Sequence, residues 1–480
     1  MMSVIEPSVN DYVEIIKPLP LRLRLSYGIG HVLNDVCASM WFTYLLVYFH
    51  FVLQFDSILS GIVLLVGQVA DALATPFVGI QSDITDGFWL CKYGRRKSWH
   101  LVGTICVLGS FPFIFSSCIH CENSDHWAQL IYYSSFVIIF QFGWASVQIS
   151  HLSLIPDLTP CEHERTSLTA IRYSFTVISN IFVYVITWSV LHMTDDSNAQ
   201  IGSKDGHKFQ MIVLICIGVG AVTSFVFHLF VKEQNLHNSA IASSPGSKKS
   251  IGHLLSSLQL YQVGAVYMAT RLFVNLSQVY VPLYLHETLN KSAESLAVVP
   301  LVMFLSSFVV SLVVKPLNQR FGRKIAYFQG AVIGIGACTW IYFDTGDINF
   351  KTYFIYVVAV MLGASGSVML VTSLGITADF IGPNTDNGAF VYGAMSFSDK
   401  LSNGVGVTII QYLKCSAHSQ CTRYYGNVLG FACGGAALFG VISVFTLVPF
   451  KYNRIGGKSY SPVEEEPSEA ENVISPSQQT

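Results

Sequence analysis

Residues 57–80 read SILSGIVLLVGQVADALATPFVGI, a run of apolar residues interrupted by a single acid, Asp71. A helix of this length crosses the hydrocarbon core of a bilayer, which is about 30 Å thick. A charged side chain at that depth costs about 2.5–3.5 kcal/mol or more, so it is seldom kept without a partner or a function. The stretch therefore predicts a membrane-spanning helix with a carboxylate in its interior.

Runs of this kind recur along the whole chain of 480 residues. Hydrophobic residues make up 52% of it and charged residues 12%, about half the charged share of soluble domains. This pattern predicts an all-α polytopic membrane protein with twelve transmembrane helices, so the lipid bilayer is its first partner. The net charge of -2 gives no reason to expect a nucleic-acid partner. The predicted helices are centred near Trp41, Val66, Val107, Ile138, Val177, Ile217, Tyr267, Leu305, Ile333, Val360, Val405 and Phe439.

Lysine and arginine are distributed unevenly between the two sides that a twelve-helix count creates. With both termini on one side, that side holds eighteen of the 27 basic residues and the other side holds six. The remaining three, Arg172, Arg271 and Lys400, fall within predicted helices. Since cytoplasmic loops carry an excess of Lys and Arg, the distribution predicts that both termini are cytoplasmic.

A polar, Ser-rich segment interrupts the helical pattern near the middle of the chain. Its composition is typical of a flexible linker, and we expect it to join two six-helix bundles. The Pro-, Ser- and Glu-rich C-terminus predicts a disordered tail. The expected N-terminal tail, first bundle, linker, second bundle and C-terminal tail are residues 1–20, 21–231, 232–256, 257–450 and 451–480.

A basic turn occurs at the same place in both predicted bundles. Gly94-Arg95-Arg96-Lys97 follows the second helix, and Gly322-Arg323-Lys324 follows the eighth. Such duplication is typical of transporters whose two halves rock about a site at the midplane. We expect a cytoplasmic gate, held by ion pairs between the halves and by contacts at helix ends; the alternative is that these charges only set the topology. The predicted gate residues are Asp83, Gly94, Arg95, Arg96, Lys97 and Arg323.

Several further short motifs occupy corresponding places in a known class of transporters. They are Asn34-Asp35, Asp71-Ala72, Glu164-Arg165 with Arg172, and Ala378-Asp379 with Lys400. On these motifs and the basic turn, the chain resembles the major facilitator superfamily. Within it the chain is similar to the melibiose permease-like branch, the glycoside-pentoside-hexuronide:cation symporters. The resemblance covers nearly the whole membrane domain and implies the major facilitator fold.

A longer stretch, residues 31–44 (HVLNDVCASMWFTY), resembles lysosomal and melanosomal transporters of the same superfamily. That resemblance implies a lysosomal and melanosomal membrane protein that imports cysteine from the cytosol into the lumen. Sugar or lysophospholipid symport, as carried out by relatives in this branch, is the alternative. The sequence shows no cluster of nucleophile, base or metal ligands, so we expect neither an enzyme nor a cofactor or metal site.

The resemblance also implies roles for the charged residues within the helices. It places the substrate-facing acid at Asp35 and the first of two cation-binding acids at Asp71. Thr75 and Gln148 are expected to line the substrate site together with Asp35 and Arg172. Because both stand where the symporters have further acids, coupling to a proton or uncoupled movement is expected rather than coupling to sodium. Lys400 corresponds to a lysine near those acids. An Asp71–Lys400 pair would act as a switch that locks the two halves together in the empty carrier, or alternatively as a static brace.

Arg172 corresponds to an arginine at the sugar site of the family. A planar guanidinium suits a carboxylate, so Arg172 opposite Asp35 would give a site for a zwitterion. The alternative is an arginine that extends toward the membrane surface. Arg271 begins a polar stripe on its helix, and it either lines the same cavity or forms a structural pair.

Four cysteines and one asparagine fall in predicted non-cytoplasmic loops. Cys415–Cys421 is the first disulfide that we expect and Cys118–Cys121 the second, with free thiols as the alternative. Asn290 begins an Asn-x-Ser sequence and is a predicted glycosylation site.

Two short patterns in the N-terminal tail have the form of sorting signals. Tyr12 and Ile15 fit a tyrosine-x-x-bulky signal, and Ile15-Ile16 follows an acid at dileucine-like spacing. They predict binding by sorting adaptors.

Overall fold

The computed structural model describes residues 19–84, 93–119, 121, 124–159, 162–192, 200–233, 255–344, 347–381, 388–414 and 423–447. These residues lie within one compact unit, which ends at Leu447. They form helices joined by turns, and no β-strand occurs among them. Both predicted tails beyond this range, and most of the predicted linker, lie outside the described residues.

The described residues before the linker, 19–233, form six long helical segments and are called the N-half below. The first segment is bent, because a short 3-10 turn divides its beginning and a π-turn widens its end. The segments are α1 (Leu21–Gly28) with η2 (Ile29–His31), α2 (Val32–Val47) and η3 (Tyr48–Val52); α3 (Ser57–Ile84); α4 (Arg95–Ile114); α5 (His126–Leu158); α6 (Glu162–His192); and α7 (Gly206–Phe230).

The described residues after the linker, 255–447, form six more and are called the C-half. Three of these segments also contain a π-turn. The segments are α9 (Leu258–Leu283) with η7 (Tyr284–Thr288); α10 (Ser295–Phe321); α11 (Arg323–Phe343); η8 (Phe350–Phe354) with α12 (Ile355–Ile381); α13 (Gly388–Tyr412); and α14 (Tyr424–Val428) with η10 (Leu429–Cys433) and α15 (Gly434–Thr446).

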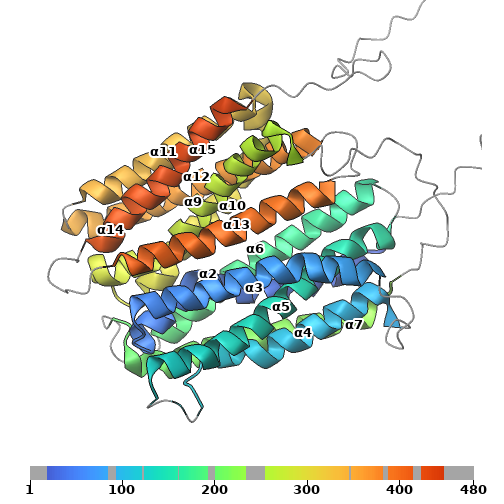
Figure 1. Cartoon of the computed structure of the whole chain (residues 1–480), viewed down its shortest axis with the longest axis horizontal. Helices are drawn as coiled ribbons and strands as arrows, with labels where there is room; N and C mark the ends of the chain where they lie inside the picture. Colours follow the sequence, from blue (N-terminus) through green and yellow to red (C-terminus); the bar gives the residue numbers. More distant parts are fainter. Residues whose placement is uncertain are drawn as a thin grey trace, which may run out of the picture. The chain divides into compact units, whose positions relative to one another are not determined.

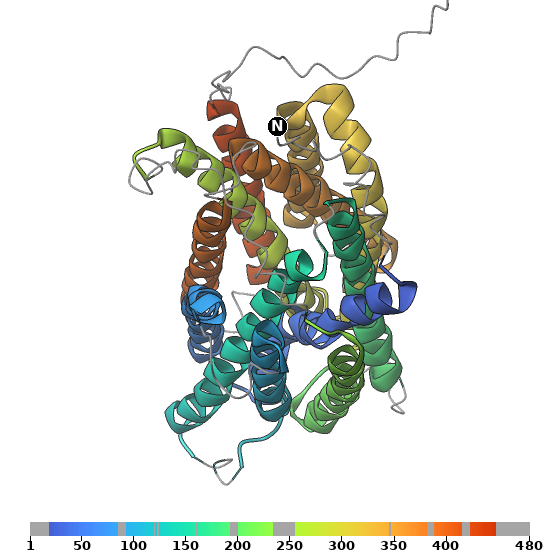
Figure 2. The ribbon, with the colours of Figure 1, turned by 90° about the vertical axis from the view of Figure 1, so that its right-hand side faces the viewer.

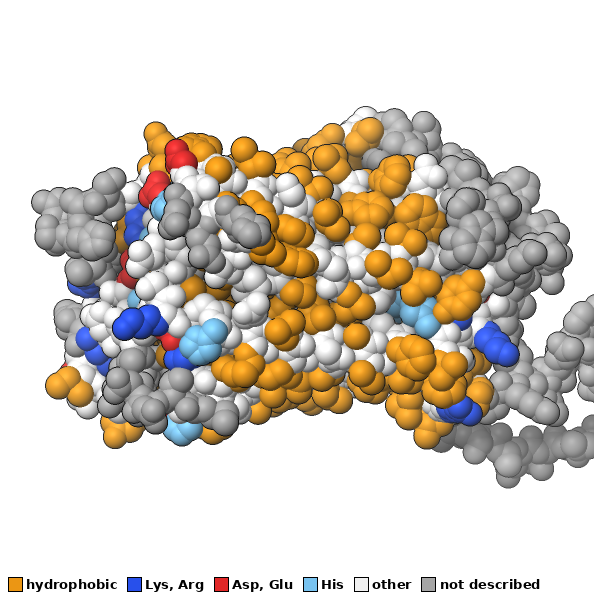
Figure 3. Space-filling model, turned by 90° about the horizontal axis from the view of Figure 1, so that it is seen from below, with side chains coloured by type: hydrophobic (Ala, Val, Ile, Leu, Met, Phe, Trp, Pro, Cys, Tyr) orange, Lys and Arg blue, Asp and Glu red, His pale blue; other side chains and the backbone are white. Residues whose placement is uncertain are grey.

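The twelve segments agree with the predicted count and centres. Within the described ranges, nine of them are long and apolar enough to cross a membrane. The other three, α4, α9 and α13, carry charged or amide side chains: α4 begins with three basic residues, α9 contains Arg271, and α13 contains Asp399 and Lys400. On the face seen in Figure 3, apolar side chains cover the middle of the molecule, with charged side chains toward the two ends. This surface suits a protein embedded in a bilayer.

The two halves lie side by side (Figures 1 and 2). Helices of the N-half, blue to green, gather on one side, and helices of the C-half, yellow-green to red, on the other. Between the halves, α3 packs along α13, α6 along α10, and α2 against α9. These three contacts bring the charged positions of α2, α3, α9 and α13 toward the interface.

The basic turns of the two halves make equivalent contacts, as the duplicated motif suggested. Gly94 and Gly322 precede α4 and α11 with φ values of 120° and 79°, which favour glycine. Lys97 donates to the carbonyl of His228 at the end of α7, and Lys324 donates to the carbonyl of Leu447 after α15. The end of the helices that carries these turns is called the Gly94 end, and the opposite end is called the Glu287 end.

Candidate functional site

A buried ion pair joins the two halves at the middle of α3 and α13. Lys400 Nζ lies 2.6 Å from Asp71 Oδ1, and the two side chains are 11% and 2% exposed. Lys400 also donates to Thr75 Oγ1 at 2.7 Å, and Thr75 in turn donates to the Asp71 carbonyl at 2.9 Å. Thr75, predicted to line a substrate site, therefore lies directly in the predicted switch.

A second ion pair lies within the C-half, beside the first. Arg271 Nε donates to Asp399 Oδ2 at 2.8 Å, and Asn403 Nδ2 donates to Asp399 Oδ1 at 2.6 Å. Asp399 and Lys400 are consecutive on α13, so their side chains point about 100° apart, toward α9 and α3 respectively. Arg271 is thus paired with Asp399 in this structure.

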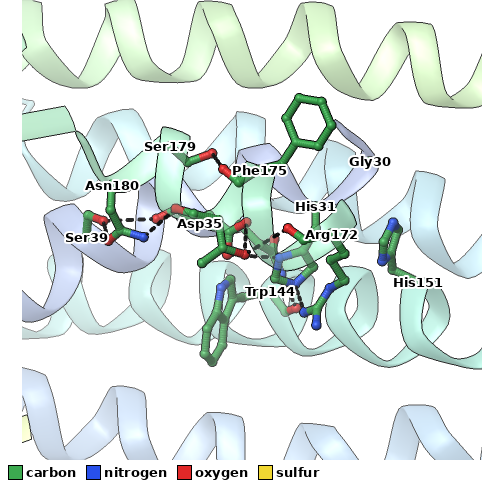
Figure 4. Close-up of polar contacts among 12 residues, drawn as sticks. Gly30, His31, Asp35, Ser39, Trp144, His151, Arg172, Phe175, Ser179 and Asn180 are labelled. Atoms are coloured by element: carbon green, nitrogen blue, oxygen red, sulfur yellow. Dashed lines mark hydrogen bonds and ion pairs between the residues drawn. The ribbon is translucent and has the colours of Figure 1, made fainter. Parts of the chain in front are cut away.

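A third charged group lies within the N-half and combines Asp35 with Arg172 (Figure 4). The two side chains do not contact directly, because His31 lies between them. His31 Nδ1 is 3.0 Å from Asp35 Oδ1, and Arg172 Nη2 is 3.0 Å from His31 Nε2. Thr176 Oγ1 donates to the other Asp35 oxygen at 3.0 Å. The predicted acid and base are thus neighbours, connected by an imidazole.

The guanidinium of Arg172 is not saturated by these contacts. Its Nε is buried and makes no hydrogen bond within the described part of the chain. A buried donor without a partner is costly in a folded protein, and it marks a place where an anion binds favourably. Asp35 also retains acceptor capacity, since a carboxylate offers about four lone-pair positions.

Trp144 on α5 lies between the first and third charged groups. Asn34 Nδ2 donates to the Trp144 carbonyl at 2.8 Å, and Lys400 Nζ is 5.9 Å from the centre of the Trp144 ring. Gln148 follows one turn later on the same helix and is partly buried. Trp144 also borders a narrow recess, which is lined by Ala38, Trp41, Phe42, Gln68, Phe140, Gln141 and Trp144.

Polar residues of the recess wall lack partners, as does Arg172 Nε. Trp41 Nε1, Gln141 Oε1 and Trp144 Nε1 are buried without a hydrogen bond to any described residue. The recess wall therefore offers two unpaired donors and one unpaired acceptor among aromatic side chains.

The predicted gate residues contact the ends of helices within their own half. Backbone N–H groups of Arg96 and Lys97 donate to Glu233 Oε2 at 3.0 and 3.2 Å, so Glu233 caps α4. Arg96 Nε also pairs with Asp157 at 2.9 Å. In the C-half, Arg323 pairs with Asp379. Arg95 is part of the first turn of α4, and the side chain of the predicted gate residue Asp83 lies outside the described residues.

Contacts at the Glu287 end cross between the halves. His50 Nε2 lies 2.9 Å from Glu287 Oε1, and Lys414 Nζ lies 2.7 Å from the same oxygen. His192 Nδ1 lies 2.5 Å from Glu294 Oε1. The N-half and C-half are therefore held together at this end by ionisable side chains.

The other predicted residues fall in loops or outside the described ranges. Cys118 and Cys121 are joined by a disulfide. Asn290 lies just after η7 with φ 51°, and its Oδ1 accepts from Gln200 at 3.3 Å. The remaining predicted residues, which lie outside the described residues, are Tyr12, Ile15, Ile16, Cys415 and Cys421.

Three residues of the charged groups were not predicted from the sequence. His31 lies four residues before Asp35, a spacing that places two side chains on one face of a helix and could have indicated the contact. Asp399 precedes Lys400 directly, and its partner Arg271 lies on another helix, so the sequence carries no local signal for that contact. For Trp144, too, no local pattern in the sequence indicates a place beside the charged groups.

Comparisons with known proteins give the family. Residues 26–415 match the MFS/sugar transport protein family. The chain is 44% identical over 459 residues to major facilitator superfamily domain-containing protein 12 of Homo sapiens, a match that covers 90% of this chain and 94% of the relative. The protein of the same name from Equus caballus is 44% identical over 454 residues, with the same coverage. Among solved structures, the D-xylose-proton symporter is similar with a TM-score of 0.66 at 13% identity, over 89% of this chain and 98% of that one.

Proposed function

The chain belongs to the MFS/sugar transport protein family of the major facilitator superfamily, and we propose that it imports cysteine into the lumen of lysosomes and melanosomes. It is a membrane transporter, not an enzyme. Cysteine, the organelles and the direction are what the resemblance of residues 31–44 implies. Movement would occur by alternating access, in which the two halves rock around a site near the midplane.

The observation that carries the proposal is the hydrogen-bonded group Asp35, His31 and Arg172 in the N-half. An amino acid presents an ammonium and a carboxylate on one carbon, and this group presents an acid and a base on neighbouring helices. Asp35 would accept from the ammonium, and Arg172 would donate to the carboxylate through its unpartnered Nε. Gln148 and the recess beside Trp144 would face the rest of the substrate.

The Asp71–Lys400 pair supports a switch between the halves. It joins α3 to α13, so the pair has to open when the halves separate at this point. Thr75 would contribute its hydroxyl to this switch rather than to the substrate. Arg271 would hold α9 against α13 through Asp399 while the halves move.

The distribution of basic residues supports an orientation with the Gly94 end and both termini in the cytoplasm. In that orientation, the cross-half contacts of His50, Glu287 and Lys414 close the lumenal end. The basic turns would act at the cytoplasmic end through the helix-end contacts that they make. Asn290 would then be on the lumenal side, where glycosylation occurs.

Any coupling ion would be a proton rather than sodium. Thr75 and Gln148 supply a hydroxyl and an amide where the related symporters have acids, so Asp71 lacks the further negative charge that a sodium site needs. A proton needs one titratable group, which Asp35, His31 or Asp71 can provide.

Uptake of radiolabelled cysteine into proteoliposomes that contain the purified protein tests the proposal. We expect saturable uptake that Asp35→Asn and Arg172→Ala each reduce at least tenfold, because each removes one of the two charges that fix the substrate. Lys351→Gln, a charge change in η8 away from the site, is the control and should transport normally. Saturable uptake of a sugar or a lysophospholipid with no cysteine uptake would show that the substrate assignment is wrong.

A further inference from the structure

We propose that His31 is an acid-sensitive positioning residue, whose neutral form holds Arg172 in place for the substrate carboxylate and whose protonation releases that carboxylate. The proposal rests on the proposed function, because it takes a carboxylate-bearing amino acid as the substrate of this site. It goes further by naming the residue through which substrate and proton affect each other's binding, and by stating that each weakens the binding of the other.

The hydrogen bonds of His31 establish which ring nitrogen carries its hydrogen. A guanidinium can only donate, so His31 Nε2 must accept from Arg172 Nη2 at 3.0 Å. The hydrogen of the neutral ring is then on Nδ1, which donates to Asp35 Oδ1 at 3.0 Å. One neutral imidazole thus connects a cation to an anion, with 6% of its side chain exposed.

This arrangement orients Arg172 without using up its donors. His31 accepts one of the five guanidinium N–H groups, and the buried Nε is free of partners among the described residues. A carboxylate that approaches Nε therefore meets a guanidinium already held in one orientation. Such preorganisation strengthens binding, because less freedom is lost when the ligand arrives.

Protonation of His31 breaks this arrangement. The imidazolium carries a hydrogen on both nitrogens, so Nε2 can no longer accept from Arg172 and two positive groups face each other at 3.0 Å. Arg172 has to move away, and the substrate carboxylate loses its oriented partner. Asp35, in contact with Nδ1, keeps the imidazolium in place, and the imidazolium then competes with the substrate ammonium for the Asp35 carboxylate.

Other titratable groups surround His31 on the neighbouring helices. They are Tyr27 of α1, His151 of α5, His100 of α4 and, behind His100, His228 of α7. His151 Nε2 donates to the Tyr27 carbonyl at 2.8 Å, and His100 Nε2 donates to the Gly30 carbonyl at 3.1 Å, so these two rings contact backbone carbonyls rather than carboxylates. Of these imidazoles, His31 is the one in contact with a carboxylate. An added proton is therefore most stable on His31.

The coupling has a consequence for the direction of transport. A proton on His31 weakens carboxylate binding, so by reciprocity a bound carboxylate weakens proton binding. The carrier then binds substrate well at neutral pH and poorly in acid. Loading from a neutral cytosol and release into an acid lumen follow from that sign.

Binding of radiolabelled cysteine to the full-length purified protein, from about pH 7.5 to about pH 5, tests the proposal. For wild type, we expect the apparent Kd to rise about tenfold or more toward acid, the equivalent of one lost charge-assisted hydrogen bond. In His31→Gln the amide oxygen accepts from Arg172 and the amide N–H donates to Asp35, but no proton can be added. This variant should bind like wild type at pH 7.5 and keep that affinity in acid.

Two further variants separate positioning from other effects. His31→Leu cannot hold Arg172 and should bind weakly at every pH, whereas the exposed His207→Gln on α7 should behave as wild type. A pH dependence that persists in His31→Gln, or wild-type affinity in His31→Leu, overturns the inference and leaves the proposed function intact. If the wild type binds neither cysteine nor any other amino acid at any pH, the proposed function is wrong as well.

Discussion

The ion pair between Asp71 and Lys400 gives a prediction with a definite size. Its charged atoms are 2.6 Å apart, and the two side chains are 2% and 11% exposed, so both charges are removed from water. Lys400→Gln leaves Asp71 as a buried carboxylate without its partner, and loss of one partner of a buried pair costs about 3–5 kcal/mol. Since 1.4 kcal/mol is tenfold in an equilibrium, the conformation that contains the pair should lose more than about a hundredfold in relative population.

Thermal unfolding of the purified protein in detergent measures this cost. Asp71→Asn and Lys400→Gln should each lower the unfolding temperature strongly. The double variant should recover most of the loss, because no unpaired charge remains in the interface. The more accessible pair Arg323–Asp379, whose side chains are 36% and 37% exposed, is the matched control. Neutralising either of its members should cost about 0–1 kcal/mol.

Two results would refute this reasoning. If either single variant unfolded at the wild-type temperature, burying the remaining charge without its partner would cost no stability. If the double variant were as unstable as the sum of the two single variants, the two side chains would contribute independently and the pair would not couple the halves.

Three further outcomes follow from other contacts. Gly94→Ala should lower the unfolding temperature more than Gly322→Ala. Both residues have positive φ, so both substitutions strain the backbone. A Cβ at Gly94 would also lie 2.6 Å from Glu233 Oε2, whereas no described atom lies within 4 Å of a Cβ at Gly322. Beyond the end of α9, burial raises the pKa of Glu287, but the imidazole and ammonium in contact with it lower that pKa below its usual value. The stabilisation from Glu287 is therefore present above the ordinary glutamate pKa of about 4.3 and lost as the pH falls through the lowered value, so Glu287→Gln should destabilise at pH 7 and do so progressively less as the solution is acidified. Asn290→Gln should increase electrophoretic mobility in glycosylating cells and remove the shift that a glycosidase produces.

The helices could be predicted from the sequence because each is a long apolar run bounded by charges or turns. The three helices that are less apolar, α4, α9 and α13, were still predicted, since the charges that interrupt them are one or two residues within a long apolar run or basic residues at one end. The same contrast identified the ionisable residues inside the membrane, because a charge within an apolar run is conspicuous.

The partners of those residues could not be predicted in the same way. Asp35 and Arg172 were expected on opposite sides of a zwitterionic substrate, and no feature of the sequence indicated that His31 lies between them. Arg271 had two possible roles, and its contact with Asp399 depends on how α9 and α13 are rotated about their axes. Helix rotation and neighbour choice are set by packing over the whole bundle, which one helix's sequence does not report.

The three charged groups differ in one respect that bears on alternating access. Asp35, His31 and Arg172 all belong to the N-half, and Arg271 and Asp399 both belong to the C-half, so these contacts move with their half when it rotates as a rigid body. Asp71 and Lys400 belong to different halves. Of the three charged contacts, the Asp71–Lys400 pair is therefore the one that such a rotation must change. The group of Asp35, His31 and Arg172 can therefore keep its geometry through the cycle. Moving between conformations instead requires the free energy to break the Asp71–Lys400 pair. A substrate or proton that weakens the Asp71–Lys400 pair lowers that cost, and this is how occupancy of a site within one half could permit movement of both.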